Sequence, residues 1–120
     1  SLSLENQIKV VLIKQPFYIK PLIQKKLENK EITELINLLR KLRDIDFYGL
    51  DYHDSFWILT NEILNKHFDN FAKEKNVIII DPTNKMLKDK NYFFDMNHLK
   101  PEGNSVLAEQ IYTQIKKHVN

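Results

Sequence analysis

The chain has 120 residues, a length typical of one domain, and its 18 basic and 16 acidic side chains leave a net charge of only +2. Because these charges are mixed along the chain, the sequence lacks the clustered basic surface that is typical of nucleic-acid binding. No apolar run approaches the ~20 residues that a membrane-spanning helix needs, and the absence of cysteine excludes disulfides, thiolate nucleophiles and zinc–thiolate sites.

The first strand is predicted near the start of the chain. Residues 1–7 are polar and are expected to be loosely held. Residues 8–13 form a nearly continuous β-branched apolar run, which is typical of a strand buried on both faces of a parallel sheet. Pro16 ends this strand, because proline cannot donate a hydrogen bond to the ladder.

The stretch 21–43 has helical character, with a break expected near Asn29. Apolar residues at spacings of three and four share one face of this stretch: Ile32, Leu35, Ile36, Leu39 and Leu42. The prediction is an amphipathic helix that covers the sheet, with a lid or a partner-binding helix as the alternative.

A turn or short extended piece is expected at 47–50, before a helix predicted at about 56–75. Asp54 or Ser55 is the predicted N-cap of that helix, because both residue types accept hydrogen bonds from the first turn. A second apolar, β-branched run at 77–80 predicts a second strand.

The predicted order of strand, helices, strand, loop and helix indicates an α/β protein with two parallel strands. Ligands of open α/β sheets bind beyond the carboxyl ends of the strands. We therefore expect a site where Gln15, Phe17, Asp81 and the loop around 95–98 come together. A sheet of two strands has open edges, so the chain is expected to be a homo-oligomer or to be poorly stable alone.

An acid and a histidine, Asp95 and His98, lie in a loop directly before the last predicted helix, which begins at Pro101 and runs to about His118. An aspartate next to a histidine can accept one ring N–H, which orients the ring and leaves the other nitrogen able to take a proton. We predict a carboxylate oxygen within roughly 2.6–3.2 Å of the ring. A structural loop pair is the alternative, whereas a metal site is disfavoured because two ligands are too few.

The sequence around this pair resembles a known family. In the SGNH, or GDSL-type, serine hydrolases, the last sequence block reads D-x-x-H-L, a small polar residue, Pro, any residue, Gly and then a helix. Three stretches of this chain are similar to that block: Asp95-Met96-Asn97-His98-Leu99, Pro101-Glu102-Gly103 and Val106-Leu107-Ala108-Glu109. The resemblance extends back through the penultimate helix and the last two strands of that family: Asn61-Glu62-Ile63, Val77-Ile78-Ile79-Ile80-Asp81, and Lys9-Val10-Val11-Leu12-Ile13 with Gln15-Pro16.

The resemblance implies a fold and an activity. The fold would be a partial doubly wound, flavodoxin-like, SGNH-type three-layer domain with parallel strands and flanking helices. Residues 1–120 would be either one domain or the C-terminal half of a larger one. Asp95 and His98 would be the catalytic acid and base of a serine esterase or O-acyltransferase that acts on a small ester, such as an acylated carbohydrate.

The same resemblance implies no cofactor and no metal, and it implies an exported or periplasmic location. The first residue is Ser1 rather than methionine, which suggests a processed product or a piece of a longer protein. The expected partners are the ester substrate and either a second copy of the chain or the remainder of that longer protein.

The sequence departs from the family at the nucleophile. The family's Gly-Asp-Ser block and its oxyanion-hole glycine and asparagine have no convincing counterpart here. His53-Asp54-Ser55 lacks the glycine, so Ser55 is expected to cap a helix, and His53 has no recognisable partner. Lys100 stands where the family has Ser or Thr, which weakens the helix cap and places a positive charge near the substrate.

The chain alone is therefore expected to be inactive. The alternative function is a non-catalytic α/β module that binds a partner through its sheet edge or through the helical stretch 21–43. Of the aromatic residues beside the pair, Tyr92, Phe93 and Phe94 are interpreted as core, with an acyl pocket as the alternative.

Overall fold

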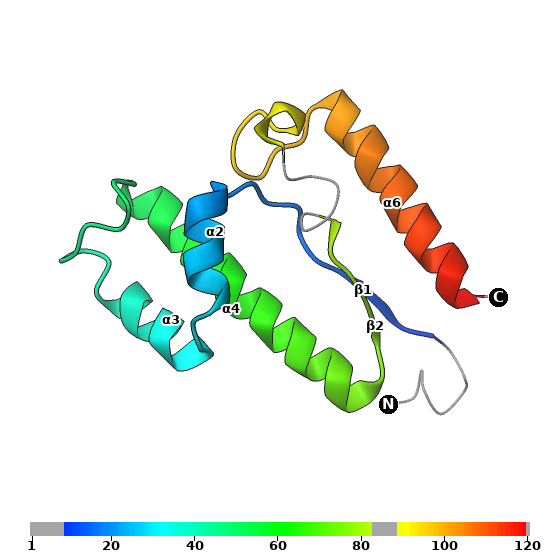
Figure 1. Cartoon of the computed structure of the whole chain (residues 1–120), viewed down its shortest axis with the longest axis horizontal. Coiled ribbons are helices and arrows are strands. Elements are labelled where there is room, and N and C mark those ends of the chain that lie inside the picture. The colour runs from blue at the N-terminus through cyan, green and yellow to red at the C-terminus, as the bar shows by residue number, and fades with distance from the viewer. Residues whose placement is uncertain (1–8, 83–88, 120) are drawn as a thin grey trace. The chain divides into compact units, whose positions relative to one another are not determined.

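The computed structural model describes residues 9–82 and 89–119, and it shows a mixed α/β chain that is mostly helical. Its described elements follow one another along the chain as drawn in Figure 1: β1 (Val11–Ile13), α2 (Pro21–Glu28), α3 (Ile32–Arg40), α4 (Tyr52–Lys75), β2 (Ile78–Ile80), the 3₁₀ turn η1 (Lys90–Tyr92) and α6 (Pro101–Val119). The chain divides into two compact units, Ser1–Tyr18 with Ala72–Asn120, and Ile19–Phe71, and the boundary between Phe71 and Ala72 lies within α4.

The first unit contains the sheet. β1 and β2 pair in parallel, with Val11 opposite Ile78 and Ile13 opposite Ile80, so the predicted strands and their direction are confirmed. Ile8, at the start of the predicted strand, lies outside the described residues.

The predicted burial of both sheet faces is wrong for part of the sheet. Ile80 is buried, but Ile13 is 44% exposed. Within residues 9–82 and 89–119, neither strand has a second neighbour. Side chains on a sheet face are buried by elements packed on that face and by side chains of neighbouring strands, and in this sheet β1 has only β2 beside it among the described residues, which explains the exposure of Ile13.

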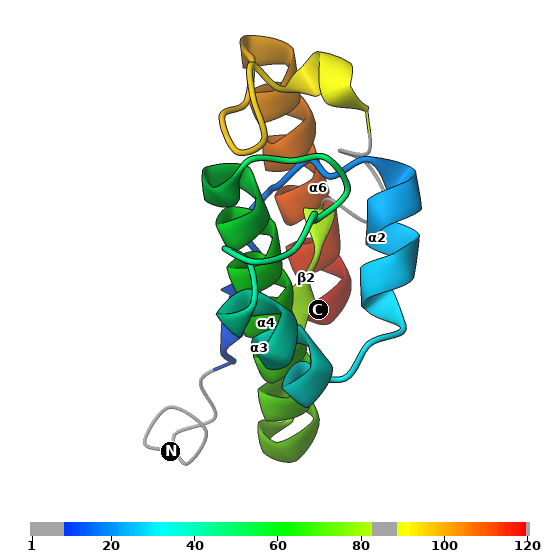
Figure 2. The ribbon, with the colours of Figure 1, turned by 90° about the vertical axis from the view of Figure 1, so that its left-hand side faces the viewer.

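Helix α6 runs antiparallel to β1 within this unit. At one end of α6, the Lys9 ammonium donates to the carbonyl oxygen of His118. At the other end, the Tyr18 amide donates to the Met96 carbonyl oxygen at 2.7 Å. The start of α6 therefore lies near the carboxyl end of β1, and both views of the ribbon show the helix passing beside the strands (Figures 1 and 2).

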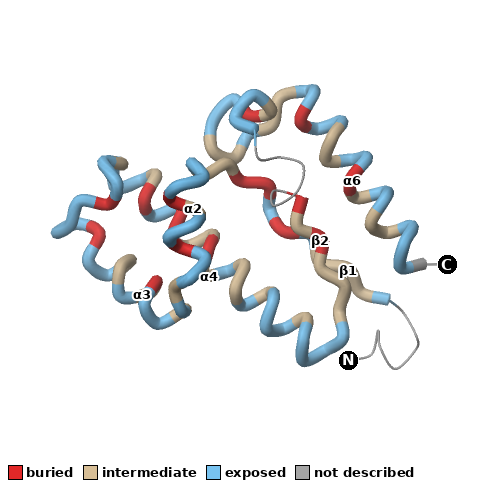
Figure 3. Tube along the Cα trace, in the orientation of Figure 1, coloured by how far each residue is buried: buried red, intermediate tan, exposed pale blue. Residues whose placement is uncertain are grey.

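The second unit is helical and has its own core. The expected break between α2 and α3 is confirmed, because Glu31 begins a new helix with a capping box to Glu34. The buried apolar side chains come from all three helices and from the segment between α3 and α4, as the buried segments in Figure 3 indicate: Ile23, Leu27, Leu35, Leu42, Phe47, Ile58 and Leu59.

Helix α4 begins earlier than its sequence predicts. Its first residue is Tyr52, and an Oδ1 of Asp51 accepts the Asp54 amide at 2.7 Å. Asp51 is therefore the cap, and the prediction of Asp54 or Ser55 is wrong. The predicted turn at 47–50 is present, with a positive φ at Tyr48 and at Gly49, and it ends directly before Asp51 and so leaves that residue in the capping position.

Candidate functional site

The Asp95–His98 loop is a small, closed hairpin. Phe93 and Leu99 form an antiparallel bridge across its base. Inside this bridge, the Phe94 amide donates to the His98 carbonyl oxygen at 2.7 Å. The four residues between Phe94 and Leu99 therefore form a tight connection in which side-chain positions are restricted by backbone hydrogen bonds.

Asp95 organises the tip of this hairpin. Its Oδ1 accepts the amides of Asn97 at 3.0 Å and His98 at 2.8 Å. Its two carboxylate oxygens lie 2.9 and 2.8 Å from Nδ1 of the His98 ring. The predicted contact between Asp95 and His98 is thus confirmed, whereas their catalytic role stays a prediction.

The contact defines how the His98 ring can act. A carboxylate only accepts hydrogen bonds, so Nδ1 carries the proton and Nε2 of the neutral ring has the lone pair. Among the described residues, none hydrogen-bonds to that Nε2. The His98 side chain is 71% exposed, and Nε2 is therefore open to a group that arrives from outside the loop.

Hydrogen bonds lower the pKa of Asp95 below its ordinary value of 3.8. The largest cause is the Asn97 amide, followed by the His98 ring, and both stabilise the ionised carboxylate. Because the folded-state pKa is depressed, the stabilisation is fully present above about pH 3.8 and is lost as the pH falls through the folded-state value.

We expect His98→Ala to raise the pKa of Asp95, but not to return it to the ordinary value. The substitution removes the ring and keeps the amides of residues 97 and 98, and the Asn97 amide is the largest cause of the shift. A carbon-detected NMR titration of the Asp95 carboxyl group measures this. His118→Ala, an exposed position on α6, is the control and should leave the titration unchanged, and an unchanged titration in His98→Ala would contradict the paired geometry.

The hairpin is held at the carboxyl end of β1, as the topology of α/β sheets predicts. The Tyr18 amide binds the Met96 carbonyl oxygen, and the Tyr18 and Phe93 rings lie 6.0 Å apart. Phe93 is buried, which agrees with its interpretation as core, whereas Phe94 is 70% exposed beside Asp95. Tyr92 is half-buried.

Helix α6 closes directly against this hairpin, and Gly103 makes the close approach possible. The Lys100 amide donates to the Tyr92 carbonyl oxygen at 2.8 Å. A Cβ at position 103 would lie only 2.5 Å from that oxygen and 2.9 Å from Cδ2 of Leu99. The glycine of the Pro-x-Gly pattern is therefore required by packing, because any side chain would push the helix away from the hairpin.

The other residues expected at this edge of the sheet are arranged differently. Lys14 and Asp81 follow the two strands and form an ion pair at 3.6 Å. Phe17 is buried and Gln15 is exposed. The sequence does not predict this ion pair at the strand ends, because nothing in the sequence distinguishes Lys14 from a surface lysine.

Ser55 is not placed as a nucleophile. Its side chain is 2% exposed, and its hydroxyl donates to the Asp51 carbonyl oxygen at 2.6 Å inside the first turn of α4. It belongs to the unit Ile19–Phe71, whereas Asp95 and His98 belong to the other unit. The hydroxyl is therefore hydrogen-bonded to the backbone of its own helix, to a carbonyl oxygen that also accepts the Ser55 amide.

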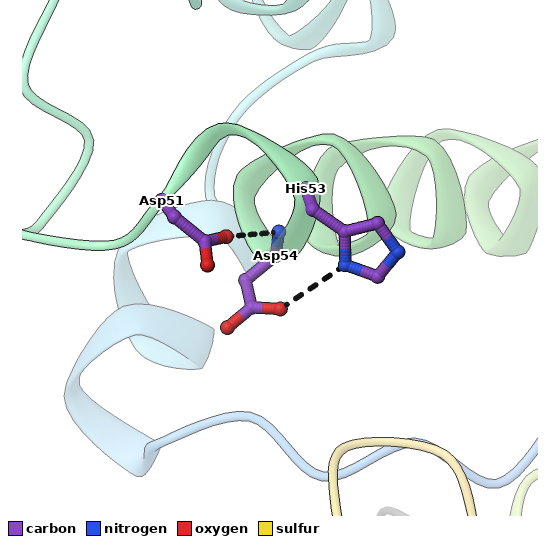
Figure 4. A group of neighbouring side chains, drawn as sticks. All are labelled: Asp51, His53 and Asp54. Carbon is purple, nitrogen blue, oxygen red and sulfur yellow. Dashed lines mark hydrogen bonds and ion pairs between the residues drawn. The ribbon is translucent and has the colours of Figure 1, made fainter.

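A second acid–histidine group lies at the start of α4 (Figure 4). His53 Nδ1 is 3.4 Å from Asp54 Oδ1, and Trp57 Nε1 donates to His53 Nε2 at 3.1 Å. The expectation that His53 lacks a partner is therefore wrong. Residues four apart are neighbours on a helix surface, so the position of Trp57 in the sequence indicates this contact.

Potential ligand atoms of Asp51, His53 and Asp54 lie within 4.8 Å of one another. However, one oxygen of Asp51 already accepts a helix amide. The Trp57 donor makes Nε2 the acceptor, so Nδ1 is protonated and faces the carboxylate. The positive end of the α4 dipole further disfavours a cation at this position, and the group is best explained as helix capping.

Comparison of the chain with family models, curated proteins and solved structures finds no significant match. None of the helices in the described part of the chain combines the length and apolar character that are needed to span a bilayer.

Proposed function

We propose that this chain supplies the acid and base of an SGNH-type serine hydrolase or O-acyltransferase. The observation that carries the proposal is the contact of the Asp95 carboxylate with Nδ1 of His98 at 2.8 Å, in a hairpin at the carboxyl end of a parallel strand. This arrangement is the one that general-base catalysis needs, with one ring nitrogen oriented and the other accessible.

The proposed reaction uses a nucleophilic serine from a Gly-Asp-Ser segment outside these 120 residues. Nε2 of His98 takes the hydroxyl proton while the serine oxygen attacks the ester carbonyl carbon. The same ring then gives the proton to the leaving alkoxide, and water or an acceptor hydroxyl repeats the sequence on the acyl-enzyme. Asp95 holds the ring and stabilises the imidazolium that forms in each half.

The proposed substrate is an acylated carbohydrate or another small ester. Phe94 offers an exposed aromatic face next to Asp95, and such faces stack on the apolar faces of sugar rings. The Lys100 ammonium lies 5.9 Å from the centre of the Phe94 ring. This lysine adds a positive charge beside the proposed binding face, which suits a substrate with an anionic group.

The proposed complete fold is a doubly wound, flavodoxin-like three-layer domain, of which this chain forms the C-terminal half. The support for it is the parallel pair β1–β2, which has an open edge on each side within the described residues. Further parallel strands, together with the helices that cover a complete sheet, would bury the exposed side chain of Ile13.

The test compares the chain alone with a longer protein that joins it to an upstream Gly-Asp-Ser segment. The 120-residue chain should not hydrolyse short acyl esters and should not label with a fluorophosphonate. Ser55 is its best candidate for a nucleophile, but this residue is buried and its hydroxyl donates to the Asp51 carbonyl oxygen. The longer protein should label at the upstream serine and turn over.

Two outcomes would contradict the proposal. Labelling of the isolated chain that disappears in Ser55→Ala would make the His53-Asp54-Ser55 stretch the active centre. A folded longer protein that neither labels nor turns over would instead favour the non-catalytic α/β module, which binds through the open edges of β1 and β2.

A further inference from the structure

The exposed face of the hairpin around His98 carries three chemically distinct side chains. Phe93 and Leu99 are bridged across the base of the hairpin and lie on one face, where Phe93 is buried. Side chains alternate along a strand, so Phe94, His98 and Lys100 are placed on the opposite face. Phe94 is 70% exposed and the His98 side chain is 71% exposed, in agreement with this alternation. We call these three side chains the hairpin face.

The Lys100 side chain starts from a backbone that is held on both sides. The Lys100 amide donates to the Tyr92 carbonyl oxygen at 2.8 Å, and the Lys100 carbonyl oxygen accepts the Asn104 amide at 2.9 Å. The Lys100 ammonium lies 5.9 Å from the centre of the Phe94 ring. The hairpin and the start of α6 thus fix where this side chain leaves the backbone, and its charge lies beside the Phe94 ring.

The hairpin does not supply a counterion to Lys100. Asp95 is the one acid between Phe93 and Lys100. Its carboxylate accepts the amides of Asn97 and His98 and contacts the His98 ring. Among the described residues, no carboxylate forms an ion pair with the Lys100 ammonium. A negatively charged group of a ligand would therefore be the counterion of this lysine.

A ligand of the hairpin face has to combine an apolar surface with a negative charge in one compact group. An exposed aromatic ring such as Phe94 stacks on the apolar face of a sugar ring, and an ammonium group forms charge-assisted hydrogen bonds with a carboxylate. Because the Lys100 ammonium lies 5.9 Å from the centre of the Phe94 ring, a carboxylate attached to a stacked sugar ring can reach it.

We propose that Lys100 determines the substrate specificity of this site, and that the substrate is an ester of an acidic sugar. The sugar ring stacks on Phe94, its carboxylate pairs with the Lys100 ammonium, and its acylated hydroxyl lies towards Nε2 of His98. This inference rests on the proposed hydrolase or acyltransferase function and adds to it the chemical class of the alcohol part of the ester.

An NMR titration of the 120-residue chain tests the binding, and it needs no serine. The methyl glycosides of glucuronic acid and glucose differ in one carboxylate, so the pair separates charge from stacking. Both should shift the amide signals of residues 94–100. The glucuronide should bind about two- to fivefold more tightly than the glucoside, because an exposed ion pair contributes only modestly.

Three substitutions locate the origin of this preference. Lys100→Gln should remove the difference between the two glycosides, and Lys100→Arg, which keeps the charge, should retain it. Lys116→Gln is the matched control, because the Lys116 ammonium lies 5.8 Å from the centre of the Tyr112 ring on α6. This control removes the same charge beside another aromatic ring and should leave the preference at the hairpin unchanged.

Turnover by the longer protein with the upstream Gly-Asp-Ser segment links the hairpin face to the base. For the O-acetyl ester of the glucuronide, Lys100→Gln should raise KM about two- to fivefold and leave kcat nearly unchanged, because the ion pair is the same in the ground state and the transition state. For the O-acetyl ester of the glucoside, neither constant should change. A succinyl ester of the glucoside, whose charge is on the acyl group, should also be insensitive to Lys100→Gln.

Equal binding of the two glycosides to the wild-type chain would overturn the inference, and so would a KM for the acidic ester that does not respond to Lys100→Gln. An effect of Lys100→Gln on the succinyl ester alone would place the negative charge on the acyl group and would also overturn it. A longer protein that turns over none of these esters would contradict the proposed function. The titration of the 120-residue chain would then support or overturn the acidic-sugar specificity by itself.

Discussion

His98→Ala should abolish ester turnover in a protein that joins this chain to an upstream Gly-Asp-Ser segment. The loss of the general base from a serine triad lowers kcat by about 10⁶-fold, since the nucleophile then stays protonated. Nε2 of His98 is the ring nitrogen that can act, because Nδ1 is held by Asp95. Steady-state hydrolysis of a short acyl ester measures the effect.

Asp95→Asn should lower turnover by about 10⁴-fold, because an amide nitrogen facing Nδ1 favours the wrong tautomer. The two effects should not add, since both residues act through one ring. His118→Ala, on the exposed C-terminal end of α6, is the matched control and should turn over normally. Turnover that survives His98→Ala in a folded protein would rule out the proposed role.

Gly103→Ala should disrupt the start of α6 and loosen the Asp95–His98 hairpin. The new methyl group would meet the Tyr92 carbonyl oxygen at 2.5 Å, and that oxygen is already held by the Lys100 amide. Relief of the clash requires a backbone shift, which we expect to cost about 1–3 kcal/mol of the free energy of unfolding. The higher helix propensity of alanine, about 1 kcal/mol, offsets part of this loss.

Urea unfolding together with hydrogen exchange of the Lys100 amide measures this effect, because the amide should exchange faster once its bond to Tyr92 is strained. Ser105→Ala is the control, since it adds alanine at an exposed position in the same turn of α6 and should be neutral or slightly stabilising. A Gly103→Ala variant that is as stable as the wild type and whose Lys100 amide exchanges at the wild-type rate would show that the helix and hairpin are not in the tight contact described.

Much of the fold follows from local patterns. The two β-branched runs become β1 and β2, and the break near Asn29 separates α2 from α3. The last helix is expected from the sequence to begin at Pro101, and α6 begins at that residue. These features depend on residues close in sequence, because β-branched runs, proline and capping residues act within a turn or a strand.

The differences between prediction and structure have physical causes as well. The sequence predicts too late a start for α4, because Asp51, Asp54 and Ser55 all have capping chemistry, and the turn at 47–50 decides which of them precedes the helix. The sequence does not predict the exposure of Ile13, because an apolar run indicates a preference for burial and not which segments pack over the strand.

For the candidate site, the sequence by itself determined the residue types and their spacing, and so the possibility that Asp95 reaches His98. Only the tertiary structure decided that the contact is made at Nδ1, that the pair is solvated, and that Tyr18 and Gly103 hold the hairpin between β1 and α6. Spacing limits what a side chain can reach along the chain. Which atoms meet, and which remain open to a substrate, depends on segments that are distant in sequence and adjacent in space.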